Sequence, residues 1–233
     1  MEKQQVLDAL KSARENSPKR NFKQSVDFIV NLKGLDLKKT EHKVDFYAHL
    51  SSLPASKIKV CALVGTEMIE NAKSGCDRAI LVDEFGQYDK KAMKKLASEY
   101  TYFVAQANIM PKVAQTFGRV LGPRGKMPNP KAGCVVPPNA NLKALVDRLR
   151  TTIRIVAKND LFIMSSVGSE EMSDEILADN VLTIYNSLLH VLPNEKDNVK
   201  SSIVKLTMGK PSTIGTQSEV KAERKGKKKR GGE

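Results

Sequence analysis

Three short apolar runs decide the fold of the central part of this chain: KIKVCALVG at residues 57–65, RAILVDE at 78–84 and TYFVAQA at 101–107. Each run has the length and the β-branched and aromatic content of a buried strand, and each precedes a stretch with helical character. Strands that alternate with helices in this way form a parallel sheet with crossover connections. The sequence therefore predicts a small parallel α/β domain in this region.

The two ends of the chain carry a different pattern, and we expect them to form one domain together. Neither end has enough strands for a sheet of its own, so the economical solution is an α+β domain built from residues 1–64 and 157–218. Residues 65–156 would then be an inserted domain, and the two chain crossings would form a hinge. The candidate elements of the terminal domain are a helix before Ser17, strands at 25–32, 43–50, 161–167 and 199–206, and a helix at 173–192.

The chain is strongly basic, which indicates a polyanionic partner. Its net charge of +13 and its pI near 9.6 favour nucleic acid or an acidic membrane surface. No apolar run has the length of a membrane span, so we expect no membrane partner and a cytoplasmic location. Residues 219–233 form a Lys-rich tail that we expect to be disordered. This tail would serve either solubility or an electrostatic tether to RNA.

The most unusual segment is GRVLGPRGKMPNPKAGCVV at residues 118–136, with four glycines, three prolines, four cations and no acid. Proline removes backbone donors and glycine relaxes the backbone, so this composition argues against a regular helix or strand and predicts a long functional loop. The acid-free stretch extends from Tyr100 to Val146, which should attract a polyanion. The loop residues expected to form an auxiliary RNA contact, or to lie beside the hinge, are Arg119, Gly122, Arg124, Gly125, Lys126, Asn129 and Lys131.

The glycines of this loop do not make a nucleotide site. A phosphate-binding P-loop requires G-x-x-x-x-G-K-[ST], but Val120 occupies the first glycine position and Met127 the hydroxyl position. The histidines are scattered, and the odd set Cys61, Cys76 and Cys134 has the spacing of ordinary reduced thiols. We therefore expect no catalytic residues, no cofactor and no metal. A nucleotide-dependent α/β enzyme is the disfavoured alternative.

A surface at the strand ends of the terminal domain suits RNA. A-form RNA is recognised largely through its shape, 2′-hydroxyls and phosphates, which a flat patch of small and hydroxyl-bearing residues can meet. Thr207, Met208 and Gly209 offer a hydroxyl, an apolar plate and close backbone approach. The structural alternative is that Phe22 anchors the core and that Met208-Gly209 is a simple strand exit. The candidate RNA-binding residues are Arg20, Phe22, Lys23, Ser25, Lys200, Ser201, Thr207, Met208 and Gly209.

Three segments together resemble one known family. GRVLGPRGKMPNPKAGCVV, KRNFKQSVDFIVNL (19–32) and KLTMGKP (205–211) are similar to the ribosomal protein L-one family, the stalk proteins of the large ribosomal subunit. The resemblance covers about residues 3–213. It implies a split β-α-β domain formed by both termini and an inserted Rossmann-like α/β domain. It also implies binding to large-subunit rRNA, contact with deacylated tRNA leaving the exit site, and repression of translation through the protein's own mRNA.

The resemblance places the principal RNA surface on the terminal domain, at Phe22, Ser25, Lys200, Ser201, Thr207, Met208 and Gly209. Two features depart from the family pattern: Lys210 precedes Pro211 where many members read TMGP, and the Lys-rich tail exceeds the core pattern. We expect an archaeal-type member that is a monomer when free and acts on the ribosome. A repressor that binds mRNA away from the ribosome is the remaining alternative.

Overall fold

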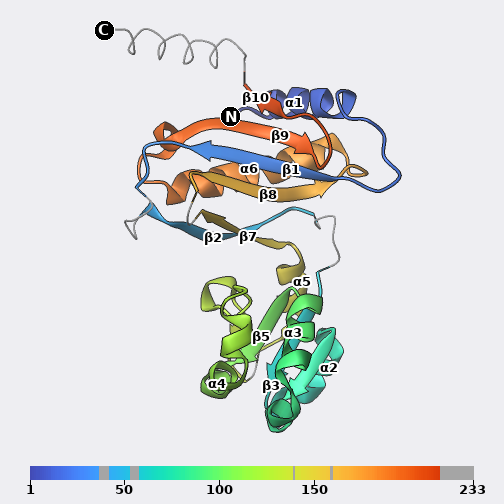
Figure 1. Ribbon diagram of the computed structural model, residues 1–233, viewed down its shortest axis with the longest axis vertical. Coiled ribbons are helices and arrows are strands. Elements are labelled where there is room, and N and C mark those ends of the chain that lie inside the picture. Colours follow the sequence, from blue (N-terminus) through green and yellow to red (C-terminus); the bar gives the residue numbers. More distant parts are fainter. Residues whose placement is uncertain (37–41, 53–57, 139, 158–159, 216–233) are drawn as a thin grey trace. The chain divides into compact units, whose positions relative to one another are not determined.

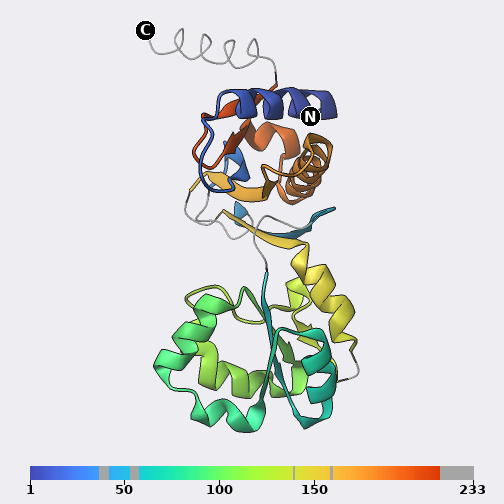
Figure 2. The same ribbon diagram turned by 90° about the vertical axis from the view of Figure 1, so that its right-hand side faces the viewer.

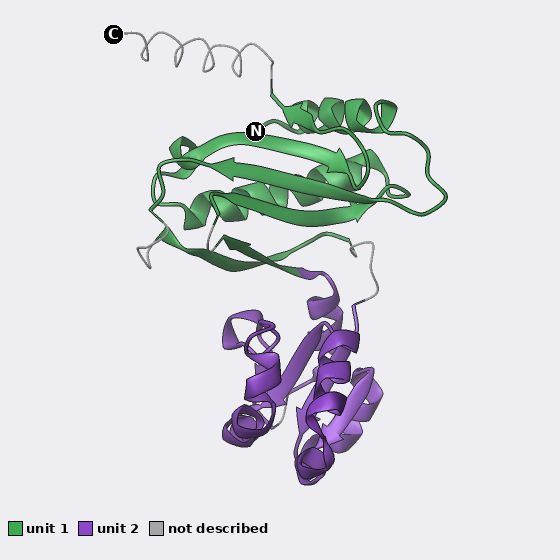
Figure 3. Cartoon of the chain, in the orientation of Figure 1, with its two compact units in different colours: residues 1–55, 153–233 green, residues 56–152 purple. Residues whose placement is uncertain are grey.

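The chain folds into two compact units, one built from both termini and the other inserted between them (Figure 1; Figure 3). Unit 1 comprises residues 1–55 and 153–233, and unit 2 comprises residues 56–152. The expected split terminal domain and inserted α/β domain are thus confirmed as the fold class. The Lys-rich tail lies outside the described residues. The structure, a computed structural model, describes residues 1–36, 42–52, 58–138, 140–157 and 160–215.

Unit 1 is a four-stranded sheet with helices on one face. Its elements are α1 (Lys3–Glu15), β1 (Ser25–Leu32), β8 (Phe162–Ser169), α6 (Asp174–Val191), β9 (Val199–Leu206) and β10 (Ser212–Ile214). The strand order is β10-β9-β1-β8, and every neighbouring pair is antiparallel. Every second residue of β1 is buried, as expected for a sheet covered on one side. α1 and α6 cover that side, where Phe28 and Val204 join Leu10 and Leu177 in the core (Figure 2).

A separate two-stranded sheet completes unit 1. It pairs β2 (Val44–His49) with β7 (Thr152–Ala157), and Val44 and Ile155 contribute to the same hydrophobic core. Arg154 donates to both carboxylate oxygens of Asp45, at 2.9 and 2.7 Å. A bidentate pair of this kind fixes the orientation of both side chains.

Unit 2 is a parallel sheet with helices on both faces. Its elements are β3 (Val60–Val64), α2 (Ile69–Gly75), β4 (Arg78–Leu81), α3 (Lys90–Glu99), β5 (Tyr102–Gln106), α4 (Met110–Leu121), β6 (Val135–Val136) and α5 (Leu142–Arg150). The strand order is β4-β3-β5-β6. Phe103 packs with α3 and α4 on one face, whereas Val104 packs with α2 and α5 on the other. All five residues of β3 are buried because this strand is covered from both sides.

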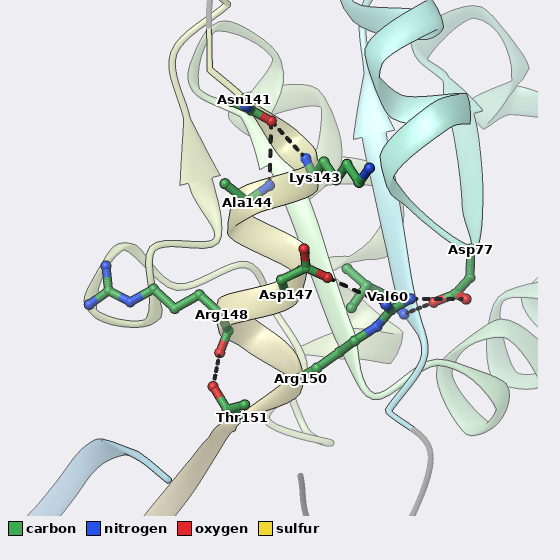
Figure 4. A network of polar contacts seen from close by, with 9 residues as sticks. All are labelled: Val60, Asp77, Asn141, Lys143, Ala144, Asp147, Arg148, Arg150 and Thr151. Carbon is green, nitrogen blue, oxygen red and sulfur yellow. Dashed lines mark hydrogen bonds and ion pairs between the residues drawn. The ribbon is translucent and has the colours of Figure 1, made fainter. Parts of the chain in front are cut away.

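A polar network ties the entrance of unit 2 to its last helix (Figure 4). Asp77 accepts a hydrogen bond from the Val60 amide at the start of β3 (2.8 Å), and Arg150 lies 3.8 Å from the other oxygen of Asp77. Arg150 also lies 3.5 Å from Asp147. At the other end of α5, the Asn141 side chain accepts from the amides of Lys143 and Ala144, as an N-cap does. The segments where the chain enters and leaves unit 2 are therefore fixed to each other within that unit.

The structure corrects the expected domain boundaries. The units divide at residues 55/56 and 152/153, not at 64/65 and 156/157. β3 belongs to unit 2 because its residues are buried between the helices of that unit. Nearly all of β7 belongs to unit 1 because it pairs with β2. Within the described residues, no helix has both the length and the apolar content needed to cross a membrane.

The segment at residues 118–136 is more regular than its composition suggests. Its first four residues, 118–121, complete α4, and its last two form β6. The expectation that glycine and proline exclude regular structure was therefore wrong at both ends. Gly118 is tolerated inside α4, and β6 begins two residues after Gly133, the last glycine of the segment.

Candidate nucleic-acid interface

The start of β1 and the end of β9 are joined at one end of the sheet by Ser25 and Thr207. Thr207 Oγ1 accepts a hydrogen bond from the Ser25 amide (3.1 Å) and lies 2.9 Å from Ser25 Oγ. The Thr207 amide in turn donates to the Ser25 carbonyl (3.0 Å). The Thr207 hydroxyl therefore acts first as a structural tie that holds the strand end in place.

A buried glutamine, which the sequence analysis missed, holds the residues that follow Thr207. Gln24 Oε1 accepts from the Met208 amide (3.1 Å), and the Gln24 backbone exchanges hydrogen bonds with Glu170. Burying an amide side chain is favourable only when its polar atoms are paired, as they are here. Strand parity could have revealed this residue, because Gln24 continues the series of buried positions that begins with Val26 in β1.

Two large apolar side chains remain exposed beside this tie. Phe22 is 53% exposed and Met208 is 55% exposed. The alternative that Phe22 is a core anchor was therefore wrong. Exposed apolar groups rimmed by polar ones are typical of interaction sites. We call this region the terminal patch, and it consists of Arg20, Phe22, Lys23, Thr207, Met208 and Lys210, all of them exposed.

Acidic residues lie directly beside the terminal patch. Lys23 Nζ is 3.0 Å from Glu171, and Glu170 Oε2 accepts from the Gln24 amide (3.3 Å). Arg14 holds this acidic segment in place by donating to Asp174 (2.8 Å) and to the Met172 carbonyl (2.9 Å). The patch is therefore less positive than its own residues suggest, which the sequence could not show because these acids are about 150 residues away along the chain.

Gly209 has a packing role. A Cβ atom at this position would lie 2.8 Å from Ser17 Oγ and 3.1 Å from Leu206 Cβ. Ser17 Oγ is itself buried and has no hydrogen-bond partner among the described residues. The glycine is thus needed for the turn to close against the segment after α1. The sequence suggested that Gly209 allows RNA to approach closely, but the packing of the turn already explains why a glycine is needed there.

Lys200 and Ser201 lie at the opposite end of β9 from the terminal patch. Ser201 pairs with Asn31 and accepts from its side chain (2.9 Å), whereas Thr207 bonds to Ser25. At roughly 3.4 Å per residue, Lys200 is more than about 20 Å from Thr207. A register shift in the pairing of β1 with β9 also leaves Lys200 without a partner residue in β1. The structure therefore does not bring together all the residues that the sequence analysis grouped.

The loop of unit 2 is closed by two turns of the same kind. The Gly125 amide donates to the Gly122 carbonyl (2.9 Å) and the Lys126 amide to the Leu121 carbonyl (3.0 Å). This pattern is a Schellman motif, with Gly125 in the left-handed conformation at φ +66°. The pattern recurs at Gly133 (φ +74°), where the amides of residues 133 and 134 donate to the carbonyls of residues 130 and 129. The loop is consequently a defined backbone structure.

Two cations of this loop are used inside unit 2. Lys126 Nζ donates to the carbonyls of Ala97 and Tyr100, both at 2.8 Å, at the C-terminal end of α3. A cation at this end is favoured by the helix dipole. Arg124 Nη1 donates to the Lys94 carbonyl (3.1 Å) and to Ser98 Oγ (3.0 Å). Burial, and to a lesser degree the charge of Arg124, lowers the pKa of Lys126.

The remaining loop candidates divide between exposed cations and structural groups. Arg119 and Lys131 are exposed. Asn129 caps the short turn at Pro130–Ala132 by accepting from the Lys131 amide (2.9 Å). A Cβ atom at Gly122 would lie 2.7 Å from the Gly118 carbonyl oxygen, so this glycine has a steric reason of its own.

The thiols have the properties of unreactive side chains. Burial raises the pKa of Cys61 to about 12 and that of Cys76 and Cys134 to about 11. A thiol with such a pKa is protonated at neutral pH and is a poor nucleophile and metal ligand. In the part of the chain that the structure describes, no group of three or more His, Cys, Asp and Glu side chains could hold a metal ion.

Comparison with known proteins decides the family. The model of the ribosomal protein L1p/L10e family matches residues 10–210. The chain belongs to this family. It is 40% identical over 207 residues to the large ribosomal subunit protein uL1 of Nanoarchaeum equitans, covering 87% of this chain and 96% of the relative. It is 39% identical over 216 residues to the uL1 of Methanothermococcus thermolithotrophicus, covering 92% and 99% of the two chains.

A third relative, the uL1 of Hyperthermus butylicus, is 37% identical over 211 residues, covering 90% of this chain and 95% of the relative. All three come from archaea, which confirms the archaeal-type pattern expected from the sequence. Members of the family are ribosomal proteins of the large subunit and not enzymes, and rRNA is the partner that membership implies.

Proposed function

We propose that the terminal patch is the surface through which this ribosomal protein binds the rRNA of the large-subunit stalk. The observation that carries this proposal is the exposure of Phe22 and Met208 on a rigid support. Both side chains stand beside backbone segments fixed by Gln24, Ser25 and Thr207. A preorganised apolar surface loses little conformational entropy on binding.

The chemistry of the patch fits RNA. An aromatic ring can stack on an unpaired base, and a methionine can pack against a ribose or a base. The exposed Arg20, Lys23 and Lys210 supply charge for phosphates. The apolar pair would then give specificity, while the cations give affinity that falls as salt rises.

The test compares two matched double variants by gel-shift titration with large-subunit rRNA. Phe22→Ala/Met208→Ala removes the apolar pair of the patch. Phe162→Ala/Met164→Ala is the control, because these side chains are 46% and 62% exposed on β8 of the same unit. We expect the patch variant to bind at least about 30-fold more weakly, since base stacking contributes about 1–3 kcal/mol per base. Equal affinities of the two variants would refute the assignment.

The finer roles in translation are also part of this proposal. In the cytoplasm, on the large ribosomal subunit, the protein would contact exit-site tRNA and assist the release of deacylated tRNA. Free protein would repress its own mRNA if that mRNA presents the same RNA structure to the terminal patch. The family resemblance supports these roles, and the exposed patch gives them a common surface.

One reporter experiment separates repression from ribosomal function. The leader of the protein's own mRNA is fused to a reporter in a cell-free system, and purified protein is added in excess over ribosomes. We expect the wild type to lower reporter synthesis and the Phe22→Ala/Met208→Ala variant to leave it unchanged. Equal repression by both would show that repression does not use the terminal patch.

A further inference from the structure

Helix α3 of unit 2, labelled in Figure 1, carries a cluster of lysines that the proposed rRNA-binding surface does not include. Its sequence, KKAMKKLASE, places exposed lysines at 90, 91, 94 and 95, while Met93, Leu96 and Ala97 are buried. At 3.6 residues per turn, these four lysines fall within an arc of about 140°. We call the surface formed by Lys90, Lys91, Lys94, Lys95, Ser98 and Arg124 the α3 face.

The lysines of the α3 face are not neutralised by ion pairs with acids. None of the four lysines has an acidic partner in the part of the chain that the structure describes. Glu99 follows Lys95 by four residues and lies at the edge of the lysine arc, but it pairs with Lys59 (3.6 Å). Lys90 and Lys94 are four positions apart, and so are Lys91 and Lys95. Like charges at this spacing repel each other and destabilise the helix. A bound anion would remove this repulsion.

Arg124 extends the face from the neighbouring loop. Its Nη1 donates to the Lys94 carbonyl and to Ser98 Oγ, so the guanidinium lies over the middle of the lysine arc. These contacts engage one guanidinium nitrogen and leave the donors of the others for a ligand. Lys126, which donates to the carbonyls at the C-terminal end of α3, adds to the positive potential of the α3 face.

We propose that the α3 face binds the phosphate backbone of RNA. The face offers lysines, one guanidinium and one hydroxyl, and its exposed positions include no apolar side chain. A helix that binds a membrane surface needs an apolar face toward the lipid, and a protein interface has an apolar centre. Point charges without base-reading groups instead suit phosphates and bind them without sequence preference.

This proposal rests on the proposed function, because the terminal patch brings the chain to RNA. Once that patch is bound, the α3 face meets further phosphates at a high effective concentration. It would therefore add affinity and salt dependence but not specificity. The phosphates could belong to the same rRNA or to a tRNA, which share this chemistry.

The test replaces the four lysines together in the full chain. The variant Lys90→Gln/Lys91→Gln/Lys94→Gln/Lys95→Gln is compared with a control of equal charge change, Lys73→Gln/Lys112→Gln/Lys143→Gln/Lys196→Gln, all exposed positions elsewhere. Filter binding is measured with large-subunit rRNA and with total deacylated tRNA over a series of salt concentrations. Thermal melting should show the α3 variant at least as stable as the wild type.

For at least one RNA, we expect the α3 variant to bind about tenfold or more weakly than the control, with a salt slope lower by about 2–3. Equal affinities and slopes in both RNA arms would overturn the proposal. Binding to phosphatidylserine vesicles is measured as a third arm, and a loss of binding confined to this arm would also overturn the proposal and assign the face to lipid. A wild type that does not prefer rRNA to tRNA would instead refute the proposed function.

Discussion

The loop of unit 2 and the terminal patch of unit 1 both contain cations and a methionine, but their polar groups have different roles. In the loop, Gly125 and Gly133 close Schellman turns, and Lys126 donates to the end of α3. At the terminal patch, the buried Gln24 and the Thr207 hydroxyl make the structural hydrogen bonds, and Phe22 and Met208 remain exposed. The difference teaches that the most distinctive sequence in this chain mainly stabilises the fold, whereas the proposed recognition surface consists of side chains that make few contacts within the fold.

The largest effect that separates the two regions should come from Lys126. Lys126→Met removes a charged donor from two carbonyls at the end of α3, which we expect to lower the free energy of unfolding by about 2–3 kcal/mol. The affinity for large-subunit rRNA should change by less than about threefold at a temperature where the variant is folded. Urea denaturation and gel-shift titration measure the two quantities.

Lys131→Met is the matched control, because Lys131 is an exposed cation of the same loop. We expect it to change the free energy of unfolding by less than about 0.5 kcal/mol. If Lys126→Met left stability unchanged and abolished rRNA binding, the loop would be a recognition element, and the contrast between a structural loop and a recognising terminal patch would be wrong.

A smaller effect should come from Gly209, where the terminal patch meets its support. Gly209→Ala places a Cβ atom 2.8 Å from Ser17 Oγ, and overpacking of this kind costs about 1–3 kcal/mol. Thermal melting should show the loss, and adding Ser17→Ala should restore part of it by removing the hydroxyl. A stable Gly209→Ala variant that fails to bind rRNA would show that the glycine serves RNA approach.

The smallest effect concerns the acids beside the patch. Glu171→Gln frees Lys23 from an exposed ion pair, which contributes only about 0–1 kcal/mol to stability. We expect rRNA binding to tighten by about two- to threefold and its salt slope to steepen slightly, because Lys23 can then meet a phosphate. Binding that weakens would indicate that the ion pair positions Lys23 for recognition.

Local patterns in the sequence were sufficient to predict the architecture. The alternation in β1 and the buried runs of β3 and β5 identify the two sheets, and the insertion follows from the shortage of strands at each end. The first boundary was misplaced at 64/65 although the buried run at 57–65 already indicated a strand of the α/β domain, and the packing of β3 between the helices of unit 2 corrects it.

The candidate site was less predictable, because its parts depend on distant contacts. Phe22 is exposed although it continues the alternation of the buried Gln24 and Val26, and the partners of Lys126 lie at the end of a helix that precedes it. The separation of Lys200 from Thr207, by contrast, follows from strand length alone and was open to prediction.

The most direct test of the central claim is oxidation footprinting of the wild-type chain. Free protein and protein bound to large-subunit rRNA are exposed to peroxide, and the sulfoxide at each methionine is measured by mass spectrometry. With rRNA at about ten times the Kd, oxidation of Met208 should slow about tenfold, because only the free fraction reacts. Met164, which is 62% exposed on β8, should react at an unchanged rate. Protection of Met164 with an unprotected Met208 would contradict the assignment of recognition to the terminal patch.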